Sequence, residues 1–140
     1  MASDKLSQKW SDRFDFFNNY GLPGSTSYRE ELKTLRWSKR GRFNFNFYGF
    51  FFGFIYFCIL GLWKKGLVLL FSSIILTTII MLLEYILDVN LSYLYRVINI
   101  SYAIFCGMSV NAAYYLQTVK EIDSWNPLQG MTKASAYELS

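Results

Sequence analysis

Apolar and polar residues alternate with the period of a helix through the first part of the chain. Four apolar residues between positions 4 and 20 are separated by steps of four, four and three: Leu6, Trp10, Phe14 and Phe17. This spacing places them on one face of an amphipathic helix. Gly21 and Pro23 then end the pattern, because both residues interrupt regular structure.

A second amphipathic helix is predicted after this break. Ser27 stands three residues before Glu30, which is the spacing of the capping box that begins many helices. We expect this helix to end at Arg40–Gly41. Helices of this kind lie on a membrane surface or pack against the rest of the protein, and the pattern favours neither.

Long apolar runs replace this pattern after residue 42. Three of them have the length of a membrane span: Phe43–Trp63, Gly66–Leu87 and Val97–Val119. At a rise of about 1.5 Å per residue, the second would be about 33 Å long, enough to cross the hydrocarbon core. The sequence therefore predicts an all-α membrane protein with two to three transmembrane helices, preceded by short amphipathic helices.

The same pattern divides the chain into three parts. Residues 1–42 would form a cytoplasmic amphipathic region, residues 43–119 a membrane domain, and residues 120–140 a polar tail that is mobile beyond Trp125. Composition agrees with this division, since 53% of the residues are hydrophobic and most of them lie in the middle part.

Basic residues flank the first apolar run on both sides. They are Lys33, Arg36, Lys39, Arg40 and Arg42 before it, and Lys64 and Lys65 after it. Such juxtamembrane clusters usually lie in the cytoplasm, so we expect these residues to contact anionic lipid headgroups and the N-terminus to be cytoplasmic. Nucleic acid is not an expected partner, because the cluster leads directly into an apolar run.

The basic residues on both sides leave two topologies for Phe43–Trp63. A full span would place Lys64 and Lys65 outside and the C-terminus outside. A re-entrant segment, which enters the membrane and turns back, would keep both lysines and the C-terminus inside. The positive-inside rule favours the re-entrant arrangement, and so do the aromatic residues and glycines of the segment. Its length favours a full span.

Two sets of small or polar residues recur at helical spacing in the apolar runs. The first is Gly49, Gly53 and Gly61, and the second is Ala103, Gly107 and Asn111. Stripes of this kind let two helices approach closely. They indicate packing within the chain or contact with another membrane protein.

Three charged residues lie near the predicted turn between the last two runs. Glu84 and Asp88 are one helical turn apart, and Arg96 follows at the start of the next run. Three roles are open: contact with headgroup water, an ion pair of Arg96 with either carboxylate, or part of an ion path.

The residues that catalysis and metal binding require are scarce. The chain has no His, and Cys58 and Cys106 stand alone within apolar runs. A nucleophile would therefore lack its usual base, and a zinc site would lack ligands. We expect a protein that is not an enzyme and has no catalytic residue, cofactor or metal.

One stretch resembles a known family. Residues 39–71 read KRGRFNFNFYGFFFGFIYFCILGLWKKGLVLLF. They are similar to the signature of a YigG-type family of small bacterial inner-membrane proteins, a domain of unknown function. The likeness covers Leu32–Leu87. It implies location in the bacterial inner membrane and assigns no catalytic residue.

These observations lead to an expected role in binding. A small helical membrane protein without catalytic groups can act through contacts with another membrane protein, and we expect an immunity protein against a membrane-acting, pore-forming toxin. The alternatives are an accessory or assembly subunit of a larger membrane complex and a small oligomeric channel, which would make the chain a homo-oligomer.

Overall fold

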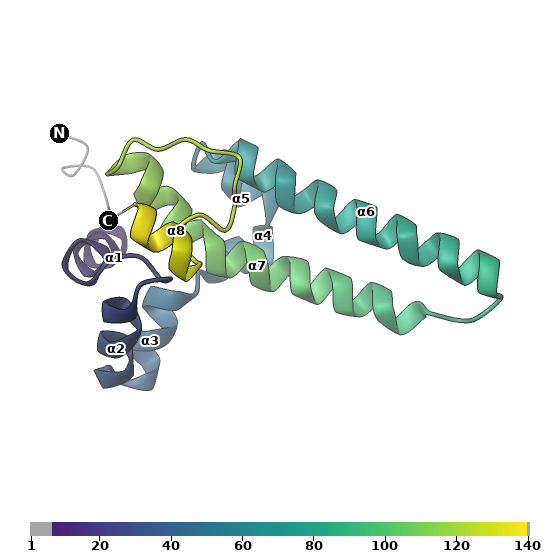
Figure 1. Cartoon of the computed structure of the whole chain (residues 1–140), viewed down its shortest axis with the longest axis horizontal. Coiled ribbons are helices and arrows are strands. Elements are labelled where there is room, and N and C mark those ends of the chain that lie inside the picture. The colour runs from purple at the N-terminus through teal and green to yellow at the C-terminus, as the bar shows by residue number, and fades with distance from the viewer. Residues whose placement is uncertain (1–6, 140) are drawn as a thin grey trace.

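The structure is a computed structural model that describes residues 7–139. Within that range the chain forms eight helices and no strand. Two long antiparallel helices project from a cluster of short ones, and the first and last helices, α1 and α8, both lie in that cluster (Figure 1). We call the long projecting pair the hairpin and the cluster the head.

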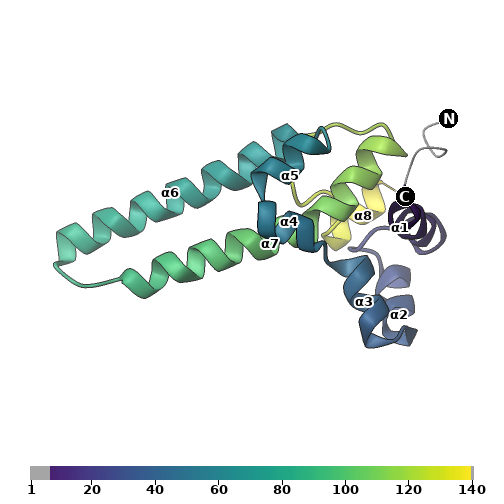
Figure 2. The same ribbon diagram turned by 180° about the vertical axis from the view of Figure 1, so that it is seen from behind.

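The hairpin is built from α6 (Trp63–Leu87) and α7 (Ser92–Thr118). Both helices are long and apolar enough to cross a membrane, by length and composition. They correspond to the second and third predicted segments. Asp88 ends α6 in the left-handed conformation, with φ 51°, a conformation that Asp tolerates better than most residues. The chain then turns at the tip, far from the head (Figure 2).

Helix α7 belongs to both parts of the molecule. Its first half is largely exposed, whereas most side chains from Cys106 to Leu116 are buried. In the most apolar 18-residue window of α7, 39% of residues are buried, compared with 6% in the corresponding window of α6. The second half of α7 is therefore the central element of the head.

Aromatic side chains form the core of the head around this half of α7. Its buried members come mainly from α1 (Gln8–Tyr20), α2 (Thr26–Thr34) and α7: Phe14, Phe16, Phe17, Tyr28 and Tyr115. Phe14 and Phe17 are buried, as the helical spacing predicts. The first positions of that predicted helix, residues 4–6, lie outside the described residues.

The predicted second helix is in fact two helices, and its start differs from the expectation. Ser25 caps α2, because its Oγ accepts a hydrogen bond from the Tyr28 N–H at 3.3 Å, whereas the Ser27 hydroxyl donates to the Tyr20 carbonyl. Leu35 is extended and ends α2, and α3 (Trp37–Asn44) follows. The break is stable because the Arg40 Nε donates to the Leu32 carbonyl at the end of α2, at 2.8 Å.

The segment Phe43–Trp63 is not one helix. It contains α4 (Phe47–Phe52) and α5 (Phe54–Ile59), separated by Gly53 with φ +49°. At about 1.5 Å per residue, six residues extend only about 9 Å, so neither helix is long enough to cross a bilayer. Helix α4 packs against α7, and α5 packs against α6, so the pair lies where the hairpin joins the head.

The C-terminal tail also differs from the expectation of mobility beyond Trp125. It returns across the head and ends in α8 (Lys133–Glu138), where Ala136 is buried in the aromatic core. The Gly24 N–H donates to the Gly130 carbonyl at 2.8 Å, which joins the tail to the turn before α2. Polar residues that suggested a free tail instead form the cap of α8, where the Thr132 Oγ1 accepts from the Ser135 N–H.

Candidate functional site

The surface of the hairpin consists largely of exposed apolar side chains. Large hydrophobic side chains of α6 and of the first half of α7 are exposed on it: Phe71, Ile74, Ile75, Leu76, Ile79, Met81, Leu82, Leu83, Ile86, Leu87, Val97, Ile100, Ile104 and Phe105. An exposed apolar surface of this kind marks a contact with a membrane or with another protein. Removing such a surface from water is favourable in free energy. We call this surface the hairpin surface.

Two small hydroxyl residues, Ser73 and Thr77, belong to the half-buried stripe of α6, with Leu69 and Ile80 on either side of them. Ser73 and Thr77 are half-buried there, and each donates its hydroxyl proton to a carbonyl of its own helix, to Leu70 and Ser73 respectively. These hydroxyls are therefore satisfied without water. Nearer the head, α6 and α7 separate to leave an apolar groove of about 410 Å³, closed at one side by residues 126–128 of the tail.

The carboxylate at the tip of the hairpin stabilises the turn. One Glu84 oxygen accepts from the Leu91 N–H at 3.0 Å, and the other accepts from the Tyr95 hydroxyl at 2.8 Å. Within residues 7–139 the single ion pair is elsewhere, so of the three roles left open, an ion pair of Arg96 with Glu84 or Asp88 is not formed. Both donors to Glu84 lie across the turn from it, so its carboxylate joins the end of α6 to the start of α7.

The first set of predicted small residues does not share a helical face, because Gly53 breaks the helix between Gly49 and Gly61. Gly49 packs within the chain: a Cβ atom there would lie 2.9 Å from the Cys106 carbonyl oxygen. Gly61, with φ +77°, ends α5 in a turn and accepts a hydrogen bond from the Gln117 side chain at 3.1 Å.

The second set lies on α7, and two of its members contact the chain that leads into α4. A Cβ atom at Gly107 would lie 2.7 Å from the Phe45 ring, and Asn111 is buried. Ala103 is half-buried, one turn closer to the tip. The stripe therefore packs within the chain at Gly107 and Asn111.

A buried pair of amides, Asn46 and Asn111, joins the head to the start of α4. The Asn46 Nδ2 donates to the Asn111 Oδ1 at 3.0 Å, and the Asn111 Nδ2 donates to the Phe43 carbonyl at 3.3 Å. The Asn46 Oδ1 also caps α4 by accepting from the Tyr48 and Gly49 N–H groups. The sequence carries a signal for this role of Asn46, because an Asn directly before an apolar run is a recognisable helix cap.

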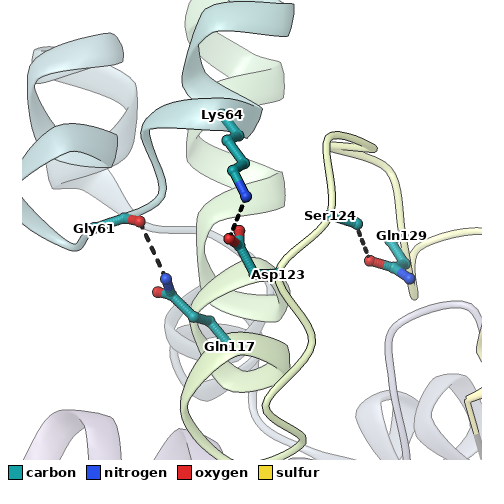
Figure 3. Close-up of polar contacts among 6 residues, drawn as sticks. All are labelled: Gly61, Lys64, Gln117, Asp123, Ser124 and Gln129. Atoms are coloured by element: carbon teal, nitrogen blue, oxygen red, sulfur yellow. Dashed lines mark hydrogen bonds and ion pairs between the residues drawn. The ribbon is translucent and has the colours of Figure 1, made fainter.

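Two of the predicted lipid contacts, Lys65 and Lys64, lie at the start of α6 and face other parts of the chain. Lys65 is only 2% exposed, because the first turn of α6 faces the core beside α5. The Lys64 Nζ lies 2.5 Å from the Asp123 Oδ2, which joins the start of α6 to the chain after α7 (Figure 3). Trp63 and Trp125 pack edge to face beside this ion pair, with ring centroids 5.5 Å apart. Lys64 therefore joins the two ends of the hairpin, and Lys65 is buried at the start of α6.

A third predicted lipid contact, Arg40, is half-buried, and its guanidinium donates to the carbonyls of Leu32 and Lys33 at the end of α2. The remaining predicted contacts of the cluster are exposed: Lys33, Arg36, Lys39 and Arg42.

Both cysteines are free, with Cys58 exposed and Cys106 buried. Among residues 7–139, no three Cys, Asp or Glu side chains gather closely enough to hold a metal ion.

Comparisons with known proteins agree on a family but name no activity. Residues 3–120 match the family described as "Protein of unknown function (DUF2628)". The chain is 32% identical over 125 residues to the uncharacterized protein YigF of Salmonella typhimurium, covering 86% of this chain and 91% of that protein. It is 29% identical over 130 residues to the uncharacterized protein YigF of Escherichia coli K12, covering 90% and 95%. No solved structure matches the chain significantly.

The predicted resemblance is therefore confirmed at the level of a bacterial family of unknown function. Its finer name is not, because the relatives carry the name YigF and not YigG.

Proposed function

Because the chain belongs to the DUF2628 family of proteins of unknown function, we propose a function from its structure: a non-enzymatic protein of the bacterial inner membrane. In this proposal the hairpin spans the bilayer, the head lies on the cytoplasmic side, and the protein acts by binding another membrane protein. The family description names no activity, so the support for this proposal comes from the surface of the chain.

The observation that carries the proposal is the exposure of α6. A core helix of a soluble protein is mostly buried, whereas only 6% of the most apolar window of α6 is buried. A signal sequence lies near the N-terminus, whereas α6 begins at Trp63, after five other helices. An exposed helix of this composition is stable in hydrocarbon and would aggregate in water.

The distribution of charge supports the orientation. Every basic residue in positions 7–139 except Arg96 lies in the head or where the hairpin joins it. Basic residues favour the cytoplasmic side of bacterial membranes, so the head would be cytoplasmic and the tip at residues 88–91 periplasmic. Both ends of the hairpin then lie in the cytoplasm. The Lys64–Asp123 ion pair requires the two ends to lie on the same side, because it joins the start of α6 to the chain after α7.

The pair α4 and α5 supports a re-entrant interpretation of the segment 43–63. Its outward aromatic side chains, Phe47, Tyr48, Phe51 and Phe52, are exposed beside the hairpin. Aromatic rings favour the membrane interface. Non-helical backbone at membrane depth must be satisfied by protein, and the Asn46 N–H donates to the Gly107 carbonyl at 2.8 Å.

The partner would bind to the hairpin surface. If the hairpin spans the bilayer, this surface is the part of the chain that a second membrane protein can reach. Neutralisation of a pore-forming toxin is one activity that such contact can produce. Stable association in a larger membrane complex is the alternative, with the same surface as its contact.

Membrane integration is tested by alkaline extraction of membranes from cells that produce the full chain. We expect the protein to stay in the pellet with integral proteins. Release into the supernatant would contradict the proposal, because a hairpin that spans the bilayer is not removed by alkali.

Binding through the hairpin is tested with substitutions that leave the packing within the chain intact. Ile75→Ala and Leu82→Ala remove exposed side chains of α6, so the fold should keep its thermal stability. If the chain protects against a toxin, we expect these variants to lose protection, whereas Lys9→Ala, at an exposed position of α1, keeps it. A constant stoichiometric partner in mild detergent, with unchanged killing across candidate toxins, would favour the alternative role.

A further inference from the structure

The helices α2 and α3 form an arm that projects sideways from the head. Figures 1 and 2 both show the pair directed across the long axis of the hairpin. We call residues 26–44 the arm. In a membrane that the hairpin crosses, an element with this direction runs along the membrane surface.

The arm carries an excess of positive charge that the rest of the chain does not neutralise. Its basic residues are Arg29, Lys33, Arg36, Lys39, Arg40 and Arg42, and its acidic residues are Glu30 and Glu31. Six positive and two negative charges leave a net charge of +4. Within residues 7–139 the one ion pair is Lys64–Asp123, so the four exposed cations, Lys33, Arg36, Lys39 and Arg42, have no carboxylate partner there.

An exposed tryptophan lies among these cations. Trp37 is 88% exposed at the start of α3, between Arg36 and Lys39 in sequence, and it is the most exposed large hydrophobic residue of positions 7–139. A tryptophan in full contact with water is unfavourable, whereas its amphipathic ring is stable at the headgroup level of a bilayer. Gly41, one turn further along α3, has open space beside it, because nothing in residues 7–139 lies within 4 Å of a Cβ atom placed there.

The arm is held rigidly enough to fix the direction of these side chains. Phe43 of α3 stacks on Phe16 of α1 with ring centroids 4.4 Å apart, and the Arg13 Nε donates to the Arg42 carbonyl at 3.0 Å. Tyr28 of α2 is buried, and its hydroxyl donates to the Asn44 Oδ1 at 3.1 Å. Burial raises the pKa of Tyr28, so this hydroxyl keeps its proton at all physiological pH values.

The covalent path from the arm to the membrane is short. Helix α3 ends at Asn44, and only Phe45 and Asn46 separate it from α4, whose outer aromatic residues are exposed beside the hairpin. If α4 lies at the membrane interface, as the proposed function has it, the arm begins at the level of the headgroups.

We propose that the arm is a binding surface for the anionic phospholipid headgroups of the membrane that the hairpin crosses, with Trp37 inserted at the interface. Four unpaired cations provide the charge complementarity, and the direction of the arm brings them to the headgroups together. The inference rests on the proposed membrane location, but it does not depend on any protein partner.

A fluorophore on the arm tests this proposal in the full chain. Ser38, exposed beside Trp37, is replaced by Cys in a Cys58→Ala, Cys106→Ala background and labelled with an environment-sensitive dye. The protein is reconstituted in nanodiscs of phosphatidylcholine alone or with phosphatidylglycerol. We expect phosphatidylglycerol to shift the emission to the blue and to make the dye accessible to a headgroup-linked quencher, and salt to reverse both effects.

Two charge-matched variants separate a specific surface from general attraction. Arg36→Gln, Lys39→Gln and Arg42→Gln together remove three charges from the arm, and Lys9→Gln, Lys120→Gln and Lys133→Gln remove three exposed charges elsewhere. Each juxtamembrane charge changes the docking equilibrium by about fivefold, so the arm variant should lose most of the response while the control variant keeps it.

The outcomes distinguish this inference from the proposed function. A dye that stays in water with both lipids, in a protein that alkali does not extract, would overturn the arm proposal and leave the membrane location intact. An equal response in neutral and anionic lipid, or an equal loss in the two variants, would overturn it as well. Extraction of the protein by alkali would overturn the membrane location on which both proposals rest.

Discussion

At the scale of single residues, two helical glycines of this chain should respond to the same substitution with opposite signs. At Gly49 a new Cβ atom would meet the Cys106 carbonyl oxygen at 2.9 Å and a Val110 methyl at 3.0 Å. At Gly41 it would meet nothing within 4 Å. Gly49→Ala should therefore destabilise the fold by about 1–3 kcal/mol, whereas Gly41→Ala should stabilise it by about 0.5–1 kcal/mol.

Thermal unfolding in detergent, followed by circular dichroism, measures both changes. The comparison is internal, because the substitution is the same and both sites are helical. A gain in stability at Gly49 equal to that at Gly41 would show that α4 does not pack closely on α7.

The buried amides Asn46 and Asn111 should be energetically coupled. Asn46→Ala removes the cap of α4 and leaves the Asn111 Oδ1 without its donor, so we expect a loss of about 1–3 kcal/mol. Asn111→Ala should cost a similar amount. In the double variant no buried amide is left unpaired, so the combined loss should be smaller than the sum by about 0.5–3 kcal/mol. Additive losses would indicate that the two side chains do not share a hydrogen bond.

At the scale of elements, Gly53 decides whether segment 43–63 is one helix or two. Its φ of +49° is unfavourable for any residue with a Cβ atom, and that atom would lie 3.2 Å from the Tyr102 ring. Gly53→Ala should therefore destabilise the protein by about 1–3 kcal/mol. In a continuous helix the same change would stabilise it by about 0.5–1 kcal/mol. The sign of the change in midpoint temperature is the test.

Some elements of this fold could be predicted from sequence and others could not, for identifiable reasons. Helix α6 was predictable because a long run of Leu and Ile has one stable form in hydrocarbon. The division of α7 was not, because burial of its second half depends on residues of α1, α4 and α5 that are distant in sequence. The glycines of segment 43–63 favoured a bend, but the position of the break at Gly53 could not be predicted, since a glycine tolerates both helical and positive φ.

The candidate site shows the same limit. The hairpin surface follows from composition, and so does the exposed basic cluster around Trp37. The burial of Lys65 and the pairing of Lys64 with Asp123 do not, because they require the tail to return to the start of α6. Local sequence places charges near a membrane, but tertiary contacts decide which of them remain free.

At the scale of the whole molecule, the chain combines two solutions to the burial of apolar side chains. The head buries its aromatic residues against the second half of α7, as a soluble domain does. The hairpin has no protein to cover it within residues 7–139, and only a bilayer or a partner can do so. The proposed function follows from that division, because the head would fix the orientation of a hairpin whose surface contacts the membrane and a partner.

The central claim is that the hairpin crosses the inner membrane with both of its ends in the cytoplasm. Single cysteines at Val89, exposed at the tip, and at Ser38, exposed on the arm, test it in the background without Cys58 and Cys106. Intact spheroplasts are treated with a membrane-impermeant thiol reagent, and the same treatment follows lysis.

We expect Val89→Cys to be labelled in intact spheroplasts and Ser38→Cys to be labelled only after lysis. Labelling of both positions or of neither before lysis would show that the tip and the arm lie on the same side. That result would contradict a hairpin that spans the membrane.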